Sequence, residues 1–329
     1  MRRLAFVAAT SFFAAPALAQ STGAARLNPV VELLEQKRPV FGLYAPANPR
    51  VRAGETAAVQ AATKTPAQLA KDAMGYTRAD YIFDGSMERN FERTYPAFAE
   101  LARGMFDGGM LQRAPAPRLG HPLFVKTPEI AADPAIARER IGKQLDLGVN
   151  GIVFVDVKSA DEVRQGLAMM RFASKGGTRS DDVGDAPARW GMSAQEYRDR
   201  ADLWPLNPRG ELVNFTIVES REGLEKVREI AAVPGIGVLF PGAGTLRGVF
   251  STVDSTGRRV LDEAAWEGAI QRVLAACKEF KVACGYPASE RDIETRMQQG
   301  FSVFIIGWGE AGFRAVDIGR RAAGRNSAP

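Results

Sequence analysis

Four acidic residues stand where buried strands are expected to end. Asp84, Glu88, Asp156 and Glu219 each lie at or just past a short apolar run. Because the carboxyl ends of parallel strands open at one rim, we expect some of these side chains to converge on one pocket. A cluster of carboxylate oxygens suits Mg2+, Mn2+ or Ca2+ better than zinc. The pattern therefore predicts an acidic pocket in which a divalent cation is the cofactor to test.

The elements that must position these groups alternate regularly along the chain. From residue 39 onward, a short apolar run, a Gly, Pro or polar break and a segment of helical periodicity follow one another repeatedly. Several helical segments begin with start signals, such as Ser159 followed by Glu162 and Ser289 followed by Asp292. The predicted strands are Val40–Tyr44, Tyr81–Phe83, Leu123–Lys126, Gly151–Val155, Leu212–Val218, Gly237–Phe240, Val282–Tyr286 and Ser302–Ile306.

Eight strand–helix units predict an α/β fold, a (β/α)8 TIM barrel occupying residues 20–329 as a single domain. A doubly wound open sheet is the alternative that composition does not separate from it. The dinucleotide fingerprint is missing, because the Gly-rich pieces at Gly235–Gly237 and Gly242–Gly244 do not complete Gly-x-Gly-x-x-Gly. We interpret both pieces as tight turns.

Two stretches interrupt the repeat. Residues 45–64, with three helix-breaking Pro and Gly residues, predict an extended loop after the first strand. Residues 173–210 form a longer insertion with a short helical piece near Ser193–Leu203. Long insertions in barrels often cover the active site, so we expect a lid rather than a solvated loop or an oligomer contact.

The amino terminus resembles a secretory signal. Arg2 and Arg3 precede an apolar run from Leu4 to Leu18, and the small residues before Gln20 predict cleavage after Ala19. The run is shorter than the roughly 20 residues of a membrane span, and the polar residues of a twin-arginine signal are missing. Residues 1–19 are therefore expected to be a signal peptide. The mature protein is expected to be periplasmic or secreted and not held in a membrane.

The charge balance argues against nucleic acid as the main partner. Removing two arginines with residues 1–19 lowers the formal charge from +5 to +3, and the remaining charges are dispersed. With 46% hydrophobic and 25% charged residues, the composition is that of an ordinary globular protein.

The sequence has only two cysteines and one histidine. Cys277 and Cys284 exclude a multi-cysteine zinc site, and they form either one disulfide, which export permits, or two buried thiols. His121 precedes an apolar strand, where a structural role is expected. A histidine-rich metal site is excluded.

Seven segments, taken in order, resemble the HpcH/HpaI aldolase and citrate lyase family. They are Asp84-Gly-Ser-Met-Glu-Arg-Asn, Phe124-Val-Lys-Thr-Pro, Leu145-Asp-Leu-Gly-Val-Asn-Gly-Ile, Ser159-Ala-Asp-Glu-Val, Gly177-Thr-Arg-Ser, Val218-Glu-Ser-Arg-Glu-Gly and Val233-Pro-Gly-Ile-Gly-Val-Leu-Phe. The resemblance implies a barrel of the phosphoenolpyruvate/pyruvate-binding type, often oligomeric. It also implies a lyase that makes or breaks carbon–carbon bonds beside a pyruvate enolate held on Mg2+ or Mn2+, with the cation acting as a Lewis acid.

The metal-binding positions of the family are matched in part. Glu219 matches the metal-binding glutamate, but the second ligand, an aspartate, falls on Gly244. We expect Asp156 or Asp84 to replace it, with Asp156 as the preferred second ligand. The neighbouring Gly242 and Ala243 are expected to contribute to substrate binding.

The catalytic positions are also mixed. The aldolase base histidine falls on Met87, and Lys126 stands where the family has an arginine, which keeps the charge but loses the two-pronged donor geometry. Asp146 matches the acidic residue of the Leu-Asp-x-Gly element and is expected to act in catalysis. Arg179 matches an arginine expected to bind substrate. Both could equally be surface or ion-pair residues.

Two functions follow from these matches. The first is a carbon–carbon lyase on a 2-oxo acid or related carboxylate, in which Glu88, Asp84 or a metal-bound water supplies the missing base. In that enzyme Lys126 holds an anion or forms a Schiff base. The alternative is an exported barrel without catalysis that binds a small acid or a partner protein.

Overall fold

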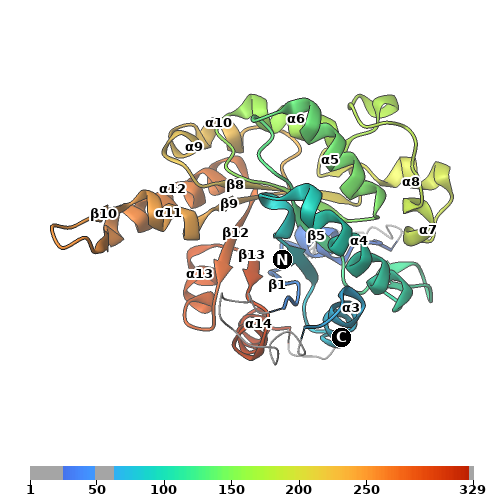
Figure 1. Ribbon diagram of the computed structural model, residues 1–329, viewed down its shortest axis with the longest axis horizontal. Helices are drawn as coiled ribbons and strands as arrows, with labels where there is room; N and C mark the ends of the chain where they lie inside the picture. The colour runs from blue at the N-terminus through green and yellow to red at the C-terminus, as the bar shows by residue number, and fades with distance from the viewer. Residues whose placement is uncertain (1–24, 49–62, 326–329) are drawn as a thin grey trace, which may run out of the picture.

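The computed structural model describes residues 25–48 and 63–325 of the chain. Its central strands are β1 (Val40–Tyr44), β2 (Tyr81–Asp84), β5 (Leu123–Lys126), β6 (Gly151–Phe154), β8 (Leu212–Val218), β9 (Val238–Pro241), β12 (Ala283–Ala288) and β13 (Val303–Ile306). They pair in that order, all parallel, and β13 pairs again with β1. The sheet is therefore a closed barrel, and the predicted TIM-barrel fold is confirmed (Figure 1).

Helices connect the strands and surround the barrel (Figure 1). They are α3 (Pro66–Gly75), α4 (Phe91–Asp107), α5 (Pro134–Asp146), α6 (Ala160–Met170), α9 (Arg221–Glu225), α10 (Val227–Ala231), α11 (Ala243–Val249), α12 (Glu263–Phe280), α13 (Ile293–Gln299) and α14 (Glu310–Ala322). Between α11 and α12, the hairpin of β10 (Ser251–Val253) and β11 (Arg259–Leu261) projects away from the barrel. A second small hairpin, β3 (Leu111–Gln112) with β4 (Arg118–Leu119), precedes β5.

Aromatic rings fill the inside of the barrel. Phe124 stacks on Phe215 with ring centroids 4.6 Å apart, and Tyr81 lies 4.9 Å from Phe124. The Tyr81 hydroxyl donates to the backbone oxygen of Phe304 at 2.9 Å, which satisfies the one polar atom that this ring buries. Gly42 faces the Tyr81 ring so closely that a side chain there would overlap it. Large and small residues thus alternate around a packed interior.

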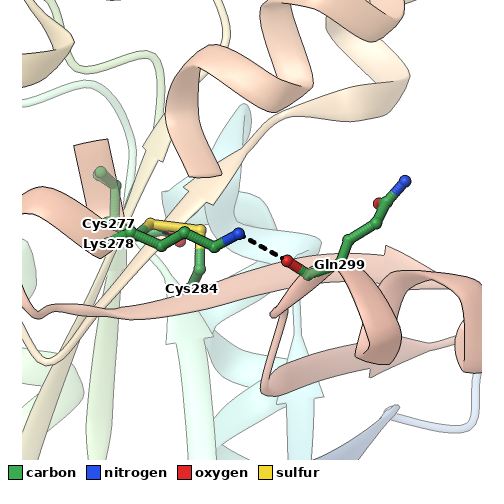
Figure 2. Close-up of a disulfide and its surroundings, with 5 residues drawn as sticks. Cys277, Lys278, Cys284 and Gln299 are labelled. Atoms are coloured by element: carbon green, nitrogen blue, oxygen red, sulfur yellow. Dashed lines mark hydrogen bonds between the residues drawn. A yellow bond between two sulfur atoms is a disulfide. The ribbon is translucent and has the colours of Figure 1, made fainter. Parts of the chain in front are cut away.

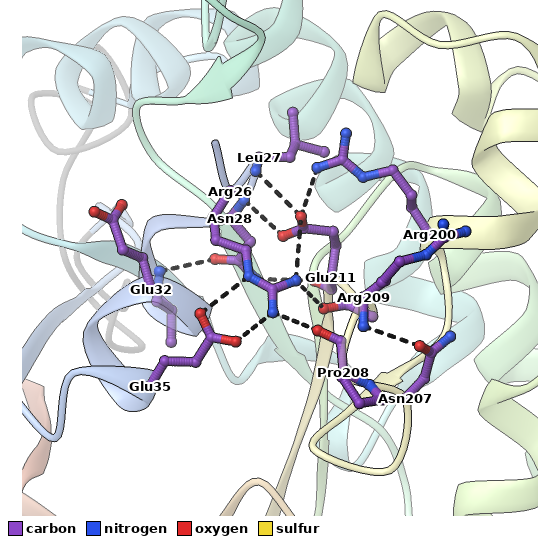
Figure 3. Close-up of polar contacts among 12 residues, drawn as sticks. Arg26, Leu27, Asn28, Glu32, Glu35, Arg200, Asn207, Pro208, Arg209 and Glu211 are labelled. Atoms are coloured by element: carbon purple, nitrogen blue, oxygen red, sulfur yellow. Dashed lines mark hydrogen bonds and ion pairs between the residues drawn. The ribbon is translucent and has the colours of Figure 1, made fainter. Parts of the chain in front are cut away.

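The amino-terminal end of the barrel is closed by α1 (Pro29–Glu35), which packs Val30, Val31 and Leu34 against the barrel interior. Glu211, fully buried just before β8, fixes this segment (Figure 3). Its carboxylate accepts from the backbone N–H groups of Leu27 and Asn28 at 3.2 and 3.0 Å and from the Arg200 guanidinium at 2.6 Å.

The insertion at residues 173–210 does not cover the carboxyl ends of the strands, so the predicted lid is wrong. It follows α6 rather than a strand, and it forms η2 (Ala173–Lys175), α7 (Ala186–Trp190), α8 (Ala194–Arg200) and β7 (Leu203–Trp204). β7 pairs with the first residues of β8. The Trp190 indole N–H donates to the Gly148 oxygen, just before β6, at 2.8 Å. A helix-to-strand connection emerges at the amino-terminal end of a barrel, opposite the catalytic rim.

Cys277, at the end of α12, and Cys284, in β12, form a disulfide across the intervening turn, with Cα atoms 5.6 Å apart (Figure 2). This confirms the disulfide over the alternative of two free thiols. Beside it, the Lys278 ammonium donates to the backbone oxygen of Gln299 at 2.8 Å. His121 is buried in a loop, with its Nε2 2.9 Å from the Tyr76 oxygen, in line with a structural role.

The predicted signal peptide lies outside the described residues, as does most of the loop at residues 45–64, whose described ends, residues 45–48 and 63–64, contain no helix or strand. Within the part of the chain that the structure describes, no helix is both long enough and apolar enough to cross a membrane.

Candidate functional site

A cavity of about 440 Å³ opens at the carboxyl end of the barrel. This volume is within the range of small-molecule sites. Its walls come from the segments that follow β2, β5, β6 and β8 and from the beginning of α11, and its polar lining includes Glu88, Arg89, Glu129, Asp156, Glu219 and Thr245. Three of the four strand-end carboxylates expected from the sequence therefore share one cavity.

Lys126 and Glu88 form an ion pair beside this cavity. The Lys126 ammonium, on the last residue of β5, lies 2.8 Å from a carboxylate oxygen of Glu88. Their side chains are 13% and 28% exposed, respectively, so the pair is shielded from bulk water but remains reachable by a ligand. The predicted catalytic residues Lys126 and Glu88 are thus brought together.

Glu219 is buried directly after β8. Its Oε1 accepts the backbone N–H of Asp156 at 3.1 Å, and the Thr245 hydroxyl also hydrogen-bonds to it. Asp156 presents this N–H from a left-handed conformation with φ of 44°, which is uncommon outside glycine. Burial raises the pKa of Glu219, although the Thr245 hydrogen bond and the nearby Lys126 charge oppose the rise.

Tyr44, the last residue of β1, belongs to the same group, and the sequence reasoning missed it. Its ring packs edge-on against Phe83, with centroids 4.8 Å apart. Burial raises the pKa of the Tyr44 hydroxyl, and the charges of Lys126, Glu88, Glu219 and Asp84 also act on it. Its position at the carboxyl end of a predicted strand was the available signal, but the sequence prediction considered charged side chains at such positions and not a tyrosine.

Arg89 and Thr245 were also missed. Arg89 is exposed at the cavity wall, and within residues 25–48 and 63–325 it makes no ion pair. Thr245, in the first turn of α11, is the hydroxyl beside Glu219. Each lies one residue after a position that the sequence reasoning considered, at Glu88 and at Gly244 respectively.

Asp84 turns its carboxylate to its own loop. One oxygen accepts from the Ser86 N–H and hydroxyl, at 2.9 and 2.6 Å. Burial raises the pKa of Asp84, and these two hydrogen bonds oppose the rise. Met87, which stands at the position of the family's base histidine, is fully buried against Gln144 and does not reach the cavity.

The glycine-rich turn after β9 sits against Glu219. A Cβ at Gly242 would lie 2.5 Å from Oε2 of Glu219, so only glycine allows this approach. Ala243 is buried, and its backbone oxygen accepts the Trp266 indole N–H at 2.9 Å. Gly242 and Ala243 therefore support the site, whereas a Cβ at Gly244 would meet nothing within 4 Å.

The residues present do not assemble the metal centre that the resemblance implies. Within residues 25–48 and 63–325, no three Asp, Glu, His or Cys side chains are grouped closely enough to hold a metal ion. Oδ2 of Asp156 lies 2.9 Å from the Lys158 ammonium, and only the backbone N–H of Asp156 faces Glu219. Its Oδ1 is buried without a hydrogen bond. Asp156 and Glu219 line the same cavity, and their role as the two carboxylate ligands of a cation stays a prediction.

Asp146 and Arg179 lie at the other end of the barrel. Asp146 is the last residue of α5, and Arg179 belongs to the insertion. They pair with each other at 3.0 Å, and the Arg179 guanidinium lies 4.4 Å from the centre of the Phe172 ring. Their expected catalytic and substrate-binding roles do not fit this position, because both residues precede strands rather than follow them.

A protein-family model described as HpcH/HpaI aldolase/citrate lyase matches residues 111–314, most of the described barrel. The chain belongs to this family. A family member from Burkholderia cenocepacia J2315 has a solved structure that aligns at a TM-score of 0.59 with 22% identity, covering 85% of this chain and 92% of that one. An HpcH/HpaI aldolase from Desulfitobacterium hafniense DCB-2 aligns at 0.57 with 16% identity, covering 93% and 98%.

One curated relative is also similar in sequence. It is the hydroxypyruvate/pyruvate aldolase of Paraburkholderia phytofirmans, 24% identical over 145 residues. The match spans 44% of this chain and 52% of the relative, about half the length of each. Together with the family, this similarity supports an aldolase-like lyase.

Proposed function

We propose that this family member is a carbon–carbon lyase that cleaves a 4-hydroxy-2-oxo acid, or a related carboxylate, to release pyruvate. The observation that carries the proposal is the Lys126–Glu88 ion pair at 2.8 Å, which lies beside the cavity that Glu88 and buried Glu219 line at the carboxyl end of the barrel. This is the face at which barrel enzymes carry their active sites. The similarity to a pyruvate aldolase supports the choice of substrate class.

The residues in and beside this cavity can carry out the separate steps of an aldol cleavage. Arg89 is a cation at the cavity wall without an ion-pair partner among the described residues, and it suits a substrate carboxylate. Glu88 can accept the proton of the hydroxyl that becomes the aldehyde. The Tyr44 hydroxyl can donate a hydrogen bond, because a phenol with its ordinary pKa of 10.0 is protonated near neutral pH and burial raises the pKa of Tyr44 further. These groups take the place of the family's base histidine, whose position holds Met87 in this chain.

The family's divalent cation would supply Lewis-acid stabilisation of the enolate oxygen. In this chain Glu219 is the one carboxylate at a family ligand position, and Gly244 offers no side-chain donor. We therefore assign the steps of the reaction to side chains in and beside the cavity.

A panel of 4-hydroxy-2-oxo acids, assayed for pyruvate release with and without Mn2+, tests the proposal. We expect release by the wild type and its loss in Glu219→Ala. Glu196→Ala is the matched control, because Glu196 is an exposed carboxylate on α8 at the opposite end of the barrel. No release from any member of the panel would contradict a lyase and favour a barrel that binds a small acid.

We also propose that the protein is exported and acts in the periplasm or outside the cell. The apolar amino-terminal segment and the Cys277–Cys284 disulfide support this location. Mass spectrometry of fractionated cells should find a mature form that begins at Gln20. An unprocessed form confined to the cytosol would contradict the proposal.

A further inference from the structure

Lys126 lies beside the cavity, at the carboxyl end of β5, and pairs with Glu88 of the cavity wall. Its backbone is fixed on both sides, because it pairs with Val153 in β6 and because Gln144 donates to its oxygen at 2.9 Å. Its side chain passes Gly85, where an added Cβ would lie 3.6 Å from Cδ of Lys126 and 3.7 Å from the Tyr44 ring. The absence of a side chain at Gly85 leaves space between the lysine and the phenol.

We propose that Lys126 forms an imine with the keto carbon of the 2-oxo acid, so that a lysine activates the substrate at a site where Gly244 stands at the family's second metal-ligand position. This inference rests on the lyase function proposed above. It adds a covalent step and names the residue that takes part.

The chemistry of the side chain supports this assignment. An arginine at this position would stay protonated and could not add to a carbonyl, whereas a lysine can lose its proton. Glu88, 2.8 Å from the Lys126 ammonium, is in place to accept that proton. The same region lacks the second carboxylate of the family's metal centre, because Gly244 stands at its position.

Each step balances without an added oxidant or reductant. The neutral amine adds to the keto carbon, and Glu88 returns its proton to the hydroxyl group of the resulting carbinolamine, which leaves as water to give the protonated imine. Glu88 then removes the proton of the C4 hydroxyl, the C3–C4 bond breaks, and its electron pair moves toward the imine to form an enamine while the aldehyde leaves. Protonation of C3 and addition of water release pyruvate and restore the amine.

A second lysine, Lys158, also lies near the cavity, and its side chain is more exposed than that of Lys126, at 34% against 13%. Its ammonium lies 2.9 Å from Asp156 and 3.4 Å from Glu129. The hydrogen bond to Asp156 raises the pKa of Lys158. Lys158 is therefore a matched control, a lysine beside the same cavity that is not expected to add to a carbonyl.

The test is reductive trapping. The purified protein is treated with a chelator, incubated with pyruvate and sodium borohydride, and analysed by intact-mass and peptide mass spectrometry. We expect one reduced three-carbon adduct per chain, located on the Lys126 peptide. The adduct should persist in Lys158→Arg and disappear in Lys126→Arg, whose folding is checked by circular dichroism and thermal unfolding.

The outcomes separate the imine from the lyase function. An unchanged wild-type mass, or an adduct that persists in a folded Lys126→Arg, would overturn the imine. If pyruvate is released from the substrate panel and no adduct forms, the lyase stands and the imine falls. If the adduct maps to Lys126 but no substrate in the panel is cleaved, the imine is supported and the proposed lyase reaction fails.

Discussion

Gly242 lies directly against the carboxylate of Glu219, and an added Cβ would be 2.5 Å from Oε2. The backbone of the turn after β9 therefore forms one wall of the Glu219 position. Thr245, three residues further on, hydrogen-bonds to the same carboxylate. Glu219 is thus held by the beginning of α11 as well as by the Asp156 N–H.

Gly242→Ala should disturb Glu219, because the new methyl group would force the carboxylate or the turn to move. We expect a loss of stability of about 1–3 kcal/mol, typical of overpacking, together with a large fall in pyruvate release. Gly244→Ala is the matched control, since a Cβ there meets nothing within 4 Å. Equal behaviour of the two variants in thermal unfolding and in the assay would show that Gly242 does not hold Glu219 in place.

Glu219→Gln should change the pH dependence of stability. Burial raises the pKa of Glu219 above its ordinary value of 4.5, so the folded state holds this proton more tightly than the unfolded chain does. The contribution of Glu219 to stability is thus fully present below the ordinary pKa and is lost as the pH rises through the raised value.

Glutamine stays neutral and its amide oxygen can still accept the Asp156 N–H. We therefore expect Glu219→Gln to unfold at a higher temperature than wild type at pH 7, with the difference shrinking near pH 4. Differential scanning calorimetry across this range measures it. A variant that is less stable than wild type at pH 7 would mean that Glu219 contributes stability in its charged form.

The fold was predictable because each strand of the barrel is a short apolar run that can be recognised in the sequence. The eight apolar runs became β1, β2, β5, β6, β8, β9, β12 and β13, most within one residue of the expected bounds. Helix starts were less secure. Ser159 is the N-cap of α6 and accepts the Glu162 N–H at 3.2 Å, but α13 begins only after Asp292, whose side chain bonds back to Ser289 instead.

The site was predictable only in part, because sequence position does not say at which end of the barrel a loop emerges. Glu88, Asp156 and Glu219 follow strands and meet in the cavity. Asp146 and Arg179 precede strands and pair with each other at the other end of the barrel, although they too stand in segments that resemble the family. Backbone contacts were also hidden in the sequence, as at Asp156, whose N–H donates to Glu219 from a left-handed conformation.

Asp146→Asn and Glu88→Gln should separate the two ends of the barrel in the assay. Asp146 pairs with Arg179 far from the cavity and its side chain is 48% exposed, so we expect pyruvate release to be unchanged. Glu88→Gln removes the proposed proton acceptor, and release should fall roughly a hundredfold or more. A large fall in a stably folded Asp146→Asn would place Asp146 in the reaction after all.

Breaking the disulfide should lower stability without stopping the reaction. Cys277 and Cys284 are 7 residues apart in sequence and close a short loop, for which the chain-entropy estimate is about 2 kcal/mol. The double variant Cys277→Ala with Cys284→Ala should unfold at a lower temperature than the oxidised wild type. A reductant should lower the midpoint of the wild type but not that of the double variant, and an equal response of both would show that the disulfide is not the cause.

Gly244→Asp should restore the second carboxylate of the family's cation site. The position follows β9 at the mouth of the cavity, next to Thr245, and an added Cβ there meets nothing within 4 Å, so the new carboxylate needs no rearrangement. Together with Glu219 it would supply the two carboxylates that the family's centre uses, a donor set suited to Mg2+ or Mn2+. In calorimetric titration of chelator-stripped protein with Mn2+, we expect heat of binding for Gly244→Asp and none for wild type or for Gly244→Asp combined with Glu219→Ala. Binding of Mn2+ by the wild type that is lost in Glu219→Ala would instead show that Glu219 recruits other donors, and would return the metal to the reaction of this chain.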